Sequence, residues 1–313
     1  MARSYRYIAA VLLVALLLAL AGCAQTTPSP TDNPETTIPT TDPTTDPPTD
    51  PPTDPPTDPP TEPPTDPPAP KIGWVEENGN RYYYSEESVM LTGWQTIEEK
   101  RYYFKEDGAM ALGKIEIEGS YRYFGSDGVE IVMVNPWNFV PEDYDPNIIL
   151  IDDWRKGDAI CKEPLMELLK ACRAAGHSPY VSSSYRTHGD QVYLHNRMIQ
   201  KYLDRGYSQE DAYAIASTIV AVPGTSEHEL GLAFDIVDND YRDLNAAQEE
   251  TETQKWLMEH CWEYGFILRY PNSKSEITGI IYEPWHYRYV GVEEALKIRD
   301  SGLCLEEYLE SLG

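Results

Sequence analysis

Two short stretches near the C-terminal end of the chain carry the residue types of a metal-assisted hydrolase. One reads SEHELGLAFDI from residue 226, and the other reads EPWHYRYV from residue 283. Together they supply two histidines and two carboxylates, which are His228, Asp235, Glu283 and His286. Two imidazoles and one carboxylate are the protein ligands of a zinc site whose fourth position stays open for water. The second carboxylate is what hydrolysis at such a site needs as a proton acceptor.

We therefore expect His228, Asp235 and His286 to bind Zn2+. Bound zinc lowers the pKa of a coordinated water to about 7. Glu283 would accept the proton of that water and return it to the leaving amine. The alternative is that the four residues are two buried structural histidines and two surface acids.

The spacing of the second stretch places Glu283 outside a regular strand. Glu283 and His286 differ in parity, so in one strand they would face opposite sides of the sheet. Pro284 cannot donate a hydrogen bond to a sheet, which predicts a bend at Glu283 before the strand proper. His286 and Arg288 would then share one face.

Other hydrolase classes lack their sequence signatures. The chain has no HExxH helix, and residues 224–228 (GTSEH) lack the final glycine of a serine nucleophile elbow. The formal net charge of -27 argues against nucleic acid as a partner, because phosphates would be repelled.

Residues 1–23 are predicted to be a processing segment. Arg3 and Arg6 precede an apolar run at 8–20, and the segment ends in Leu-Ala-Gly-Cys at residue 23. This ending resembles the lipobox of bacterial lipoproteins, which implies cleavage before Cys23 and lipidation of its thiol. The alternative is an ordinary secretory signal. The lipid would place the protein on the extracellular face of the bacterial cytoplasmic membrane, anchored without spanning it.

Residues 24–70 form a linker with no aromatic residue and no Lys or Arg. Pro-Pro-Thr-Asp or Pro-Pro-Thr-Glu units repeat every four residues within it. Such a segment stays disordered and favours extended polyproline II conformation. At ~3.1 Å per residue it spans up to about 145 Å, which suits a domain that reaches into a cell wall.

Residues 71–132 contain an internal repeat with a period of 20 residues. Gly73, Gly93 and Gly113 are in equivalent positions, and each is followed by a triplet with two or three aromatic residues, at 82–84, 102–104 and 122–124. Short aromatic strands separated by turn residues predict successive β-hairpins that stack on each other and on the domain C-terminal to them. These units resemble the choline-binding-type, cell-wall-binding repeats of Gram-positive surface proteins. Lys114 stands where that family has Trp, so cell-wall glycan or teichoic acid binding and a structural spacer both remain open.

Residues 133–313 are predicted to form an α+β domain. Helices are expected at 162–175, 191–203, 208–221, 253–264 and 292–313, and strands at 180–183, 232–237, 266–270 and 282–290. Four cysteines lie after the processing segment, at positions 161, 172, 261 and 304. Cys161 and Cys172 are about 16 Å apart if they share one helix, which is too far for a disulfide. Pairing with the other two and four free buried thiols both remain open.

The two opening stretches resemble the VanY/VanX-type zinc D-Ala-D-Ala carboxypeptidases and dipeptidases. Ser226, His228 and Asp235 match that family's Ser-x-His motif and its subsequent Asp, while Glu283 and His286 match its Glu-x-x-His. Upstream, the family's Ser-x-Tyr-Arg motif with a later Gln appears as residues 183–186 (SSYR) and Gln191.

The resemblance implies a hedgehog/DD-peptidase-like domain, with a small antiparallel sheet and flanking helices. It implies that Arg186 helps to stabilise the tetrahedral intermediate. Substrate-binding roles are implied for five further residues, which are Ser183, Tyr185, Gln191, Ser226 and Trp285.

The predicted function is removal of the terminal D-Ala from peptidoglycan stem peptides by a wall-reaching lipoprotein. An L,D-carboxypeptidase or a stem-peptide endopeptidase of the same fold is the alternative in chemistry. A non-catalytic cell-wall-binding lipoprotein is the alternative of another class.

Overall fold

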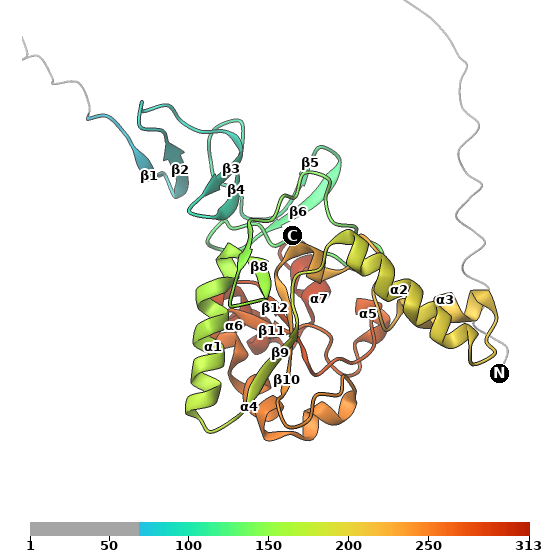
Figure 1. Cartoon of the computed structure of the whole chain (residues 1–313). Coiled ribbons are helices and arrows are strands. Elements are labelled where there is room, and N and C mark those ends of the chain that lie inside the picture. Colours follow the sequence, from blue (N-terminus) through green and yellow to red (C-terminus); the bar gives the residue numbers. More distant parts are fainter. Residues whose placement is uncertain (1–68) are drawn as a thin grey trace, which may run out of the picture. The chain divides into compact units, whose positions relative to one another are not determined.

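A computed structural model of the protein describes residues 69–313 (Figure 1). The predicted processing segment with Cys23, and the linker up to residue 68, lie outside these described residues. None of the helices in residues 69–313 combines the length and apolar character needed to cross a bilayer.

Three β-hairpins open the described part of the chain. Each hairpin is an antiparallel two-stranded sheet of its own. Their strands are β1 (Gly73–Glu77) with β2 (Asn80–Tyr84), β3 (Gly93–Ile97) with β4 (Lys100–Phe104), and β5 (Gly113–Ile117) with β6 (Ser120–Phe124). The aromatic triplets form the ends of β2, β4 and β6.

Aromatic side chains join successive hairpins. Trp74 of the first lies 5.1 Å from Tyr102 and 5.9 Å from Phe104 of the second, measured between ring centroids. Trp94 of the second lies 5.9 Å from Phe124 of the third. An isolated two-stranded hairpin is marginal in water, so this packing supplies the buried area that one unit lacks. The predicted hairpins and their stacking are confirmed.

The third hairpin packs against the last two helices, α6 (Val292–Ser301) and α7 (Leu305–Glu310). Tyr123 and Ile131 are buried in one cluster with apolar side chains of those helices. The hydroxyl of Tyr123 donates to Glu310 (3.0 Å), and the Lys114 ammonium pairs with the same carboxylate (2.6 Å). Lys114 therefore fixes the third hairpin to α7 in place of a repeat tryptophan.

A four-stranded antiparallel sheet forms the centre of the C-terminal domain. Its order is β11 (Phe266–Leu268), β12 (His286–Tyr289), β10 (Ala233–Asp238) and β9 (Pro179–Ser183). The register pairs Asp235 with His286 on one side and with Ser183 on the other. Three of the predicted site residues thus lie in one row across the sheet.

The hydrophobic core lies between the sheet and two helices, α1 (Lys162–Ala174) and α4 (Glu252–His260). Leu165 and Leu168 of α1 pack in one cluster with Phe234, Ile236 and Tyr287 of the sheet. The remaining helices are α2 (His188–Leu203), α3 (Gln209–Ser217) and the short α5 (Ser275–Thr278) (Figure 1). A small hairpin of β7 (Ile148–Leu150) and β8 (Lys156–Asp158) precedes α1. The predicted α+β class is confirmed.

Three predicted helices differ in form or length from what was expected. The helix expected at 208–221 begins on its Ser208 N-cap but ends at Ser217. The helix expected at 253–264 continues as a 3-10 helix from Cys261, and Gly265 ends it at φ 81°. The helix expected at 292–313 breaks at Gly302 into α6 and α7. All four cysteines in the described residues are buried and free.

Candidate metal centre

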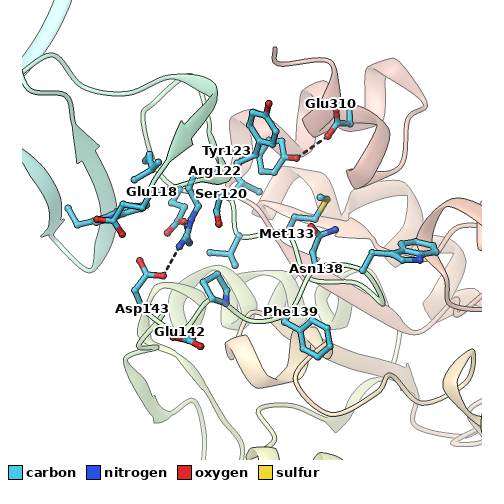
Figure 2. Close-up of a pocket in the computed structure, with 18 residues that line it drawn as sticks. Glu118, Ser120, Arg122, Tyr123, Met133, Asn138, Phe139, Glu142, Asp143 and Glu310 are labelled. Carbon is cyan, nitrogen blue, oxygen red and sulfur yellow. Dashed lines mark hydrogen bonds and ion pairs between the residues drawn. The ribbon is translucent and has the colours of Figure 1, made fainter. Parts of the chain in front are cut away.

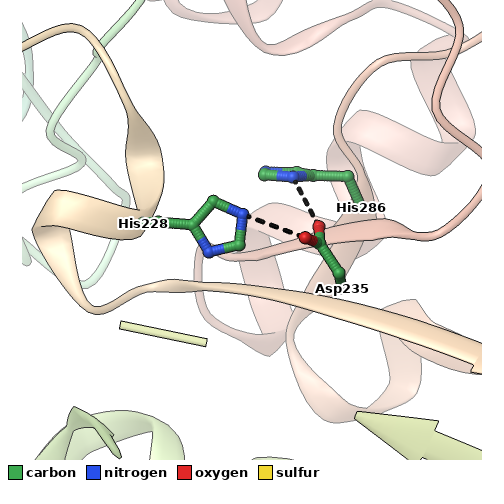
Figure 3. A group of neighbouring side chains, drawn as sticks. All are labelled: His228, Asp235 and His286. Atoms are coloured by element: carbon green, nitrogen blue, oxygen red, sulfur yellow. Dashed lines mark hydrogen bonds and ion pairs between the residues drawn. The ribbon is translucent and has the colours of Figure 1, made fainter. Parts of the chain in front are cut away.

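Three potential metal ligands converge from three elements (Figure 3). His228 lies on the 3-10 helix η2 (Glu227–Leu230), Asp235 on β10 and His286 on β12. Their ligand atoms all lie within 4.8 Å of one another, and all three residues are buried. The Asp235 carboxylate lies 3.4 Å from Nε2 of His228 and 3.1 Å from Nδ1 of His286. The two imidazole centroids are 5.0 Å apart, within reach of one coordination sphere.

Gly231 provides the turn that brings His228 and Asp235, which have six residues between them, to the same site. It ends η2 in the left-handed conformation, at φ 75°, and turns the chain into β10. A Cβ at this position would meet Ile148 Cδ1 at 2.6 Å and the Asp158 amide nitrogen at 2.8 Å. The turn therefore requires glycine for both conformation and space.

Hydrogen bonds to the outer ring nitrogens orient both imidazoles. Nδ1 of His228 lies 2.8 Å from the Ser184 carbonyl oxygen, which leaves Nε2 facing Asp235. Nε2 of His286 lies 3.4 Å from a carboxylate oxygen of Glu227, which leaves Nδ1 facing Asp235. Such outer partners fix the tautomer and direction of metal-binding histidines. Two inward nitrogens and one carboxylate are a donor set that fits zinc.

Glu227 is held by two buried arginines. One of its carboxylate oxygens accepts hydrogen bonds from Arg269 Nε (2.7 Å) and Arg288 (2.8 Å), while the other faces His286. Burial opposes ionisation of Glu227, but the two guanidinium groups outweigh it and hold its pKa well below the usual range. The ionised carboxylate thus stays available as an acceptor for His286.

Glu283 lies beside the ligands without belonging to the group. β12 begins only at His286, so Glu283 precedes the strand in a turn, as the parity argument predicts. Its carboxylate is 3.7 Å from His286 Nδ1. Burial, together with the Asp235 charge, raises the pKa of Glu283 to about 8. His286 and Arg288 both contact Glu227, which confirms that they share one face.

Arg186 joins three of the predicted site residues. Its guanidinium donates to Asp235 (3.1 Å), to the Ser183 hydroxyl (2.9 Å) and to the Gln191 side-chain oxygen (3.2 Å). Gln191 in turn donates to the Ala221 carbonyl (2.7 Å). Ser183 and Gln191 thus lie behind Arg186 and hold it toward Asp235.

A cavity of about 250 Å³ opens onto the ligand group. Arg186, Ser226, Glu283 and Trp285 line it together with the three ligands, and apolar side chains such as Ile280 and Ile281 form the rest of its wall. Tyr185, Ser183 and Gln191 do not border this cavity. The residues expected at the site therefore divide into those at the cavity and those that support Arg186.

Sequence reasoning missed Glu227 and Tyr270. The Tyr270 ring borders the cavity and lies 4.7 Å from the His286 ring. An acid between Ser226 and His228, inside a stretch otherwise expected to be buried, was the available signal for Glu227.

Comparison with known proteins assigns the C-terminal domain. The VanY family model, D-alanyl-D-alanine carboxypeptidase, matches residues 156–292. A D-alanyl-D-alanine carboxypeptidase of Enterococcus faecalis is 43% identical over 181 residues, which are 58% of this chain. The chain spans 66% of the length of that relative.

Solved structures share the fold, and one of them contains zinc. A point variant of the vancomycin-resistance D,D-pentapeptidase VanY, in complex with Zn(II), is 44% identical. The match covers 57% of this chain and 97% of that chain, with a TM-score of 0.53. The chain belongs to the VanY family. The predicted zinc carboxypeptidase class and the predicted cofactor are thereby confirmed.

The VanY family also has structural relatives with a different bond specificity. LdcB, an LD-carboxypeptidase, is 29% identical, and the match covers 64% of this chain and 95% of that chain with a TM-score of 0.52. VanYB itself is solved in complex with D-alanine-D-alanine.

The N-terminal hairpins match repeat families. A choline-binding repeat model matches residues 91–137, and a cell wall binding repeat model matches residues 72–86. The chain therefore joins a VanY catalytic domain to repeats of the cell-wall-associating type.

Proposed function

We propose that this protein hydrolyses the D-Ala-D-Ala bond at the end of peptidoglycan stem peptides. The observation that carries the proposal is the convergence of His228, Asp235 and His286 beside a fourth buried group, Glu283. A protein that only bound the wall would have no use for a carboxylate next to the ligands.

The residues divide the chemistry among them. The two imidazoles and Asp235 would hold zinc, which would supply an activated water and polarise the scissile carbonyl. Glu283 takes a proton from the attacking water and gives it to the leaving amine nitrogen. Its carboxylate lies 3.7 Å from His286 Nδ1, which places it within reach of a water at the ligand group for both transfers. Arg186 borders the cavity and supplies positive charge near the oxygen on which negative charge develops.

The D,D specificity rests on the comparison of identities. The D,D-pentapeptidase VanY is 44% identical to this chain, and the LD-carboxypeptidase LdcB is 29% identical. We therefore propose cleavage of the bond between two D-alanines in preference to L,D-carboxypeptidase cleavage of the shortened stem.

Defined stem peptides test this assignment. The zinc-loaded protein is incubated with stem pentapeptide and with stem tetrapeptide, and the products are identified by mass. We expect loss of one alanine from the pentapeptide and no change in the tetrapeptide. Release from the tetrapeptide alone would overturn the D,D assignment, and internal cleavage would show an endopeptidase.

The N-terminal regions are proposed to place the enzyme at its substrate. Lipidation at Cys23 would hold the protein on the outer face of the cytoplasmic membrane, and residues 24–70 would extend the catalytic domain into the wall. A Cys23→Ala variant should then appear in the culture medium instead of the membrane fraction. Membrane retention of that variant would argue against the lipid anchor.

A further inference from the structure

A hollow lies away from the metal ligands, between the third hairpin and residues 137–143 (Figure 2). Its volume is about 760 Å³. Three aromatic side chains that line it are unusually open to solvent: Trp137 is 63% exposed, Phe139 61% and Tyr121 60%. Exposed aromatic groups gathered along a hollow mark a ligand-binding groove more often than a plain surface. We refer to this hollow as the aromatic groove.

The loop that presents Trp137 and Phe139 is firmly anchored. The side-chain oxygen of buried Asn135 accepts hydrogen bonds from the backbone amides of Trp137 (3.1 Å) and Asn138 (3.0 Å). Its side-chain nitrogen donates to Glu306 (3.1 Å), which also pairs with Arg269. Two large rings are therefore held toward solvent on a fixed turn, which lowers the entropy cost of binding a ligand.

The charges of the aromatic groove favour a ligand without net negative charge. Arg122, the central cation of its lining, is already paired with Glu130 (3.1 Å) and Asp143 (2.6 Å). Glu118 and Glu142 also line the groove, and neither has an ion-pair partner within residues 69–313. A polyanion such as a phosphate-rich polymer would be repelled here.

We propose that the aromatic groove binds the glycan strand of peptidoglycan. Sugar rings offer apolar C–H faces that stack on aromatic rings, and their hydroxyl and N-acetyl groups need donors and acceptors of the kind that Ser120, Asn138 and Glu142 present. This inference rests on the proposed function, because the glycan strand carries the stem peptide that the metal centre would cleave.

The loop that lines the aromatic groove contacts two loops that lead into the catalytic cavity. Val140 donates from its amide to the Gly224 carbonyl (2.8 Å), and Gly224 lies two residues before Ser226 of the cavity. On the other side, a Cβ at Gly279 would meet Pro136 at 2.6 Å, and the next two residues, Ile280 and Ile281, line the cavity. Five extended residues span at most about 17 Å. The pentapeptide of a bound strand could therefore reach up to that far from the groove.

A quaternary amine such as choline is a less suitable ligand than a glycan, because cations already cover the tryptophans of the first two hairpins. The guanidinium of Arg101 lies 3.9 Å from the Trp94 ring centroid, and that of Arg81 lies 4.4 Å from Trp74. Each of these tryptophan rings therefore already has a tethered cation over it.

The test measures the full, zinc-loaded chain against two probes. One is glycan strands stripped of peptide, with the freed lactyl carboxyl groups converted to amides so that the strands carry no net charge; the other is stem pentapeptide, either free or attached to a tetrasaccharide. The variant is the double substitution Trp137→Ala and Phe139→Ala. Trp154→Ala is the matched control, because Trp154 is also exposed (56%) but lies outside the groove. Thermal unfolding of each variant checks that the fold is intact.

We expect the double variant to bind glycan strands about tenfold more weakly or worse, which corresponds to about 1.4 kcal/mol. Its KM for the glycan-linked pentapeptide should rise by a similar factor, while kcat/KM for the free pentapeptide stays unchanged. The control should match the wild type throughout.

Three results would overturn the proposal: no binding of glycan strands by the wild type, equal loss in the control, or release of bound glycan by choline. If the wild type cleaves neither peptide, the proposed function fails, and the binding of peptide-free strands still decides on the groove.

Discussion

Glu283 should be required for hydrolysis but not for metal binding. Its carboxylate is near His286 but outside the ligand group, so Glu283→Gln should keep zinc. Loss of the proton acceptor should lower kcat by about 10²- to 10⁴-fold. Zinc content and steady-state kinetics of the purified variant check this. His228→Ala, as the comparison, should lose the metal as well; substantial activity in Glu283→Gln would show that another group accepts the proton.

Glu227 should influence the metal without touching it. Glu227→Gln weakens the negative partner of His286, and we expect zinc affinity to fall by about 10- to 100-fold. Competition with a chromogenic chelator measures the affinity directly. Glu229→Gln is a suitable control, since Glu229 lies on the same 3-10 helix but contacts His188 and the Gly224 amide. Equal affinities in both variants would contradict the positioning role.

The metal ligands can be predicted from the sequence more readily than the residues that orient them. His228, Asp235 and His286 can be predicted because their types and spacing form motifs. Glu227 gains its role from arginines 42 and 61 residues away, and no local pattern reports such a long-range contact.

At the scale of the element, the turn at Gly231 sets the distance between η2 and β10. Gly231→Ala should destabilise the fold by more than the ~1–2 kcal/mol that a left-handed alanine costs, because its Cβ also meets Asp158. Gly176→Ala is matched in backbone conformation, at φ 93°, with open space around it. Urea unfolding of both variants compares the two costs. A smaller loss at Gly231 than at Gly176 would refute the steric argument.

Helix α1 begins next to Cys161 and contains the buried Cys172. We expect these two thiols, and those of buried Cys261 and Cys304, to be unreactive in the folded protein. Burial raises the pKa of Cys172 and of Cys261 to about 12 and that of Cys304 to about 11. A thiol with a pKa of about 12 is ionised in only about one molecule in ten thousand at pH 8. Iodoacetamide at pH 8 should therefore label these cysteines only after unfolding, as mass spectrometry would show. Rapid labelling of the native protein would contradict this.

Element types were easier to predict than element ends. The amphipathic periods identify α1, α2 and α4 and the apolar runs identify the strands, since burial determines both patterns. The ends depend on tertiary contacts. The strand expected from residue 282 begins only at His286, where pairing with Asp235 starts, and the last helix breaks where Gly302 adopts φ 67°.

At the scale of the whole molecule, the third hairpin packs against the catalytic domain and should contribute to its stability. A chain that starts at residue 91 lacks the first hairpin and the residues before it but keeps the other two hairpins, and it should keep the catalytic domain's stability. A chain that starts at residue 132 also loses buried Tyr123 and Ile131, each worth ~1.5 kcal/mol or more. We expect its urea-unfolding free energy to fall by about 3 kcal/mol. Equal stability of the two truncated chains would show that the hairpin contributes nothing.

The hairpins repeat their contacts as well as their sequence. The Met110 amide donates to the Arg81 carbonyl and the Glu130 amide to the Arg101 carbonyl, both at 2.8 Å and one period apart. A chain with one more 20-residue unit would preserve every such bond. The repeat segment can therefore lengthen or shorten by whole units, while the contacts of the catalytic domain stay the same.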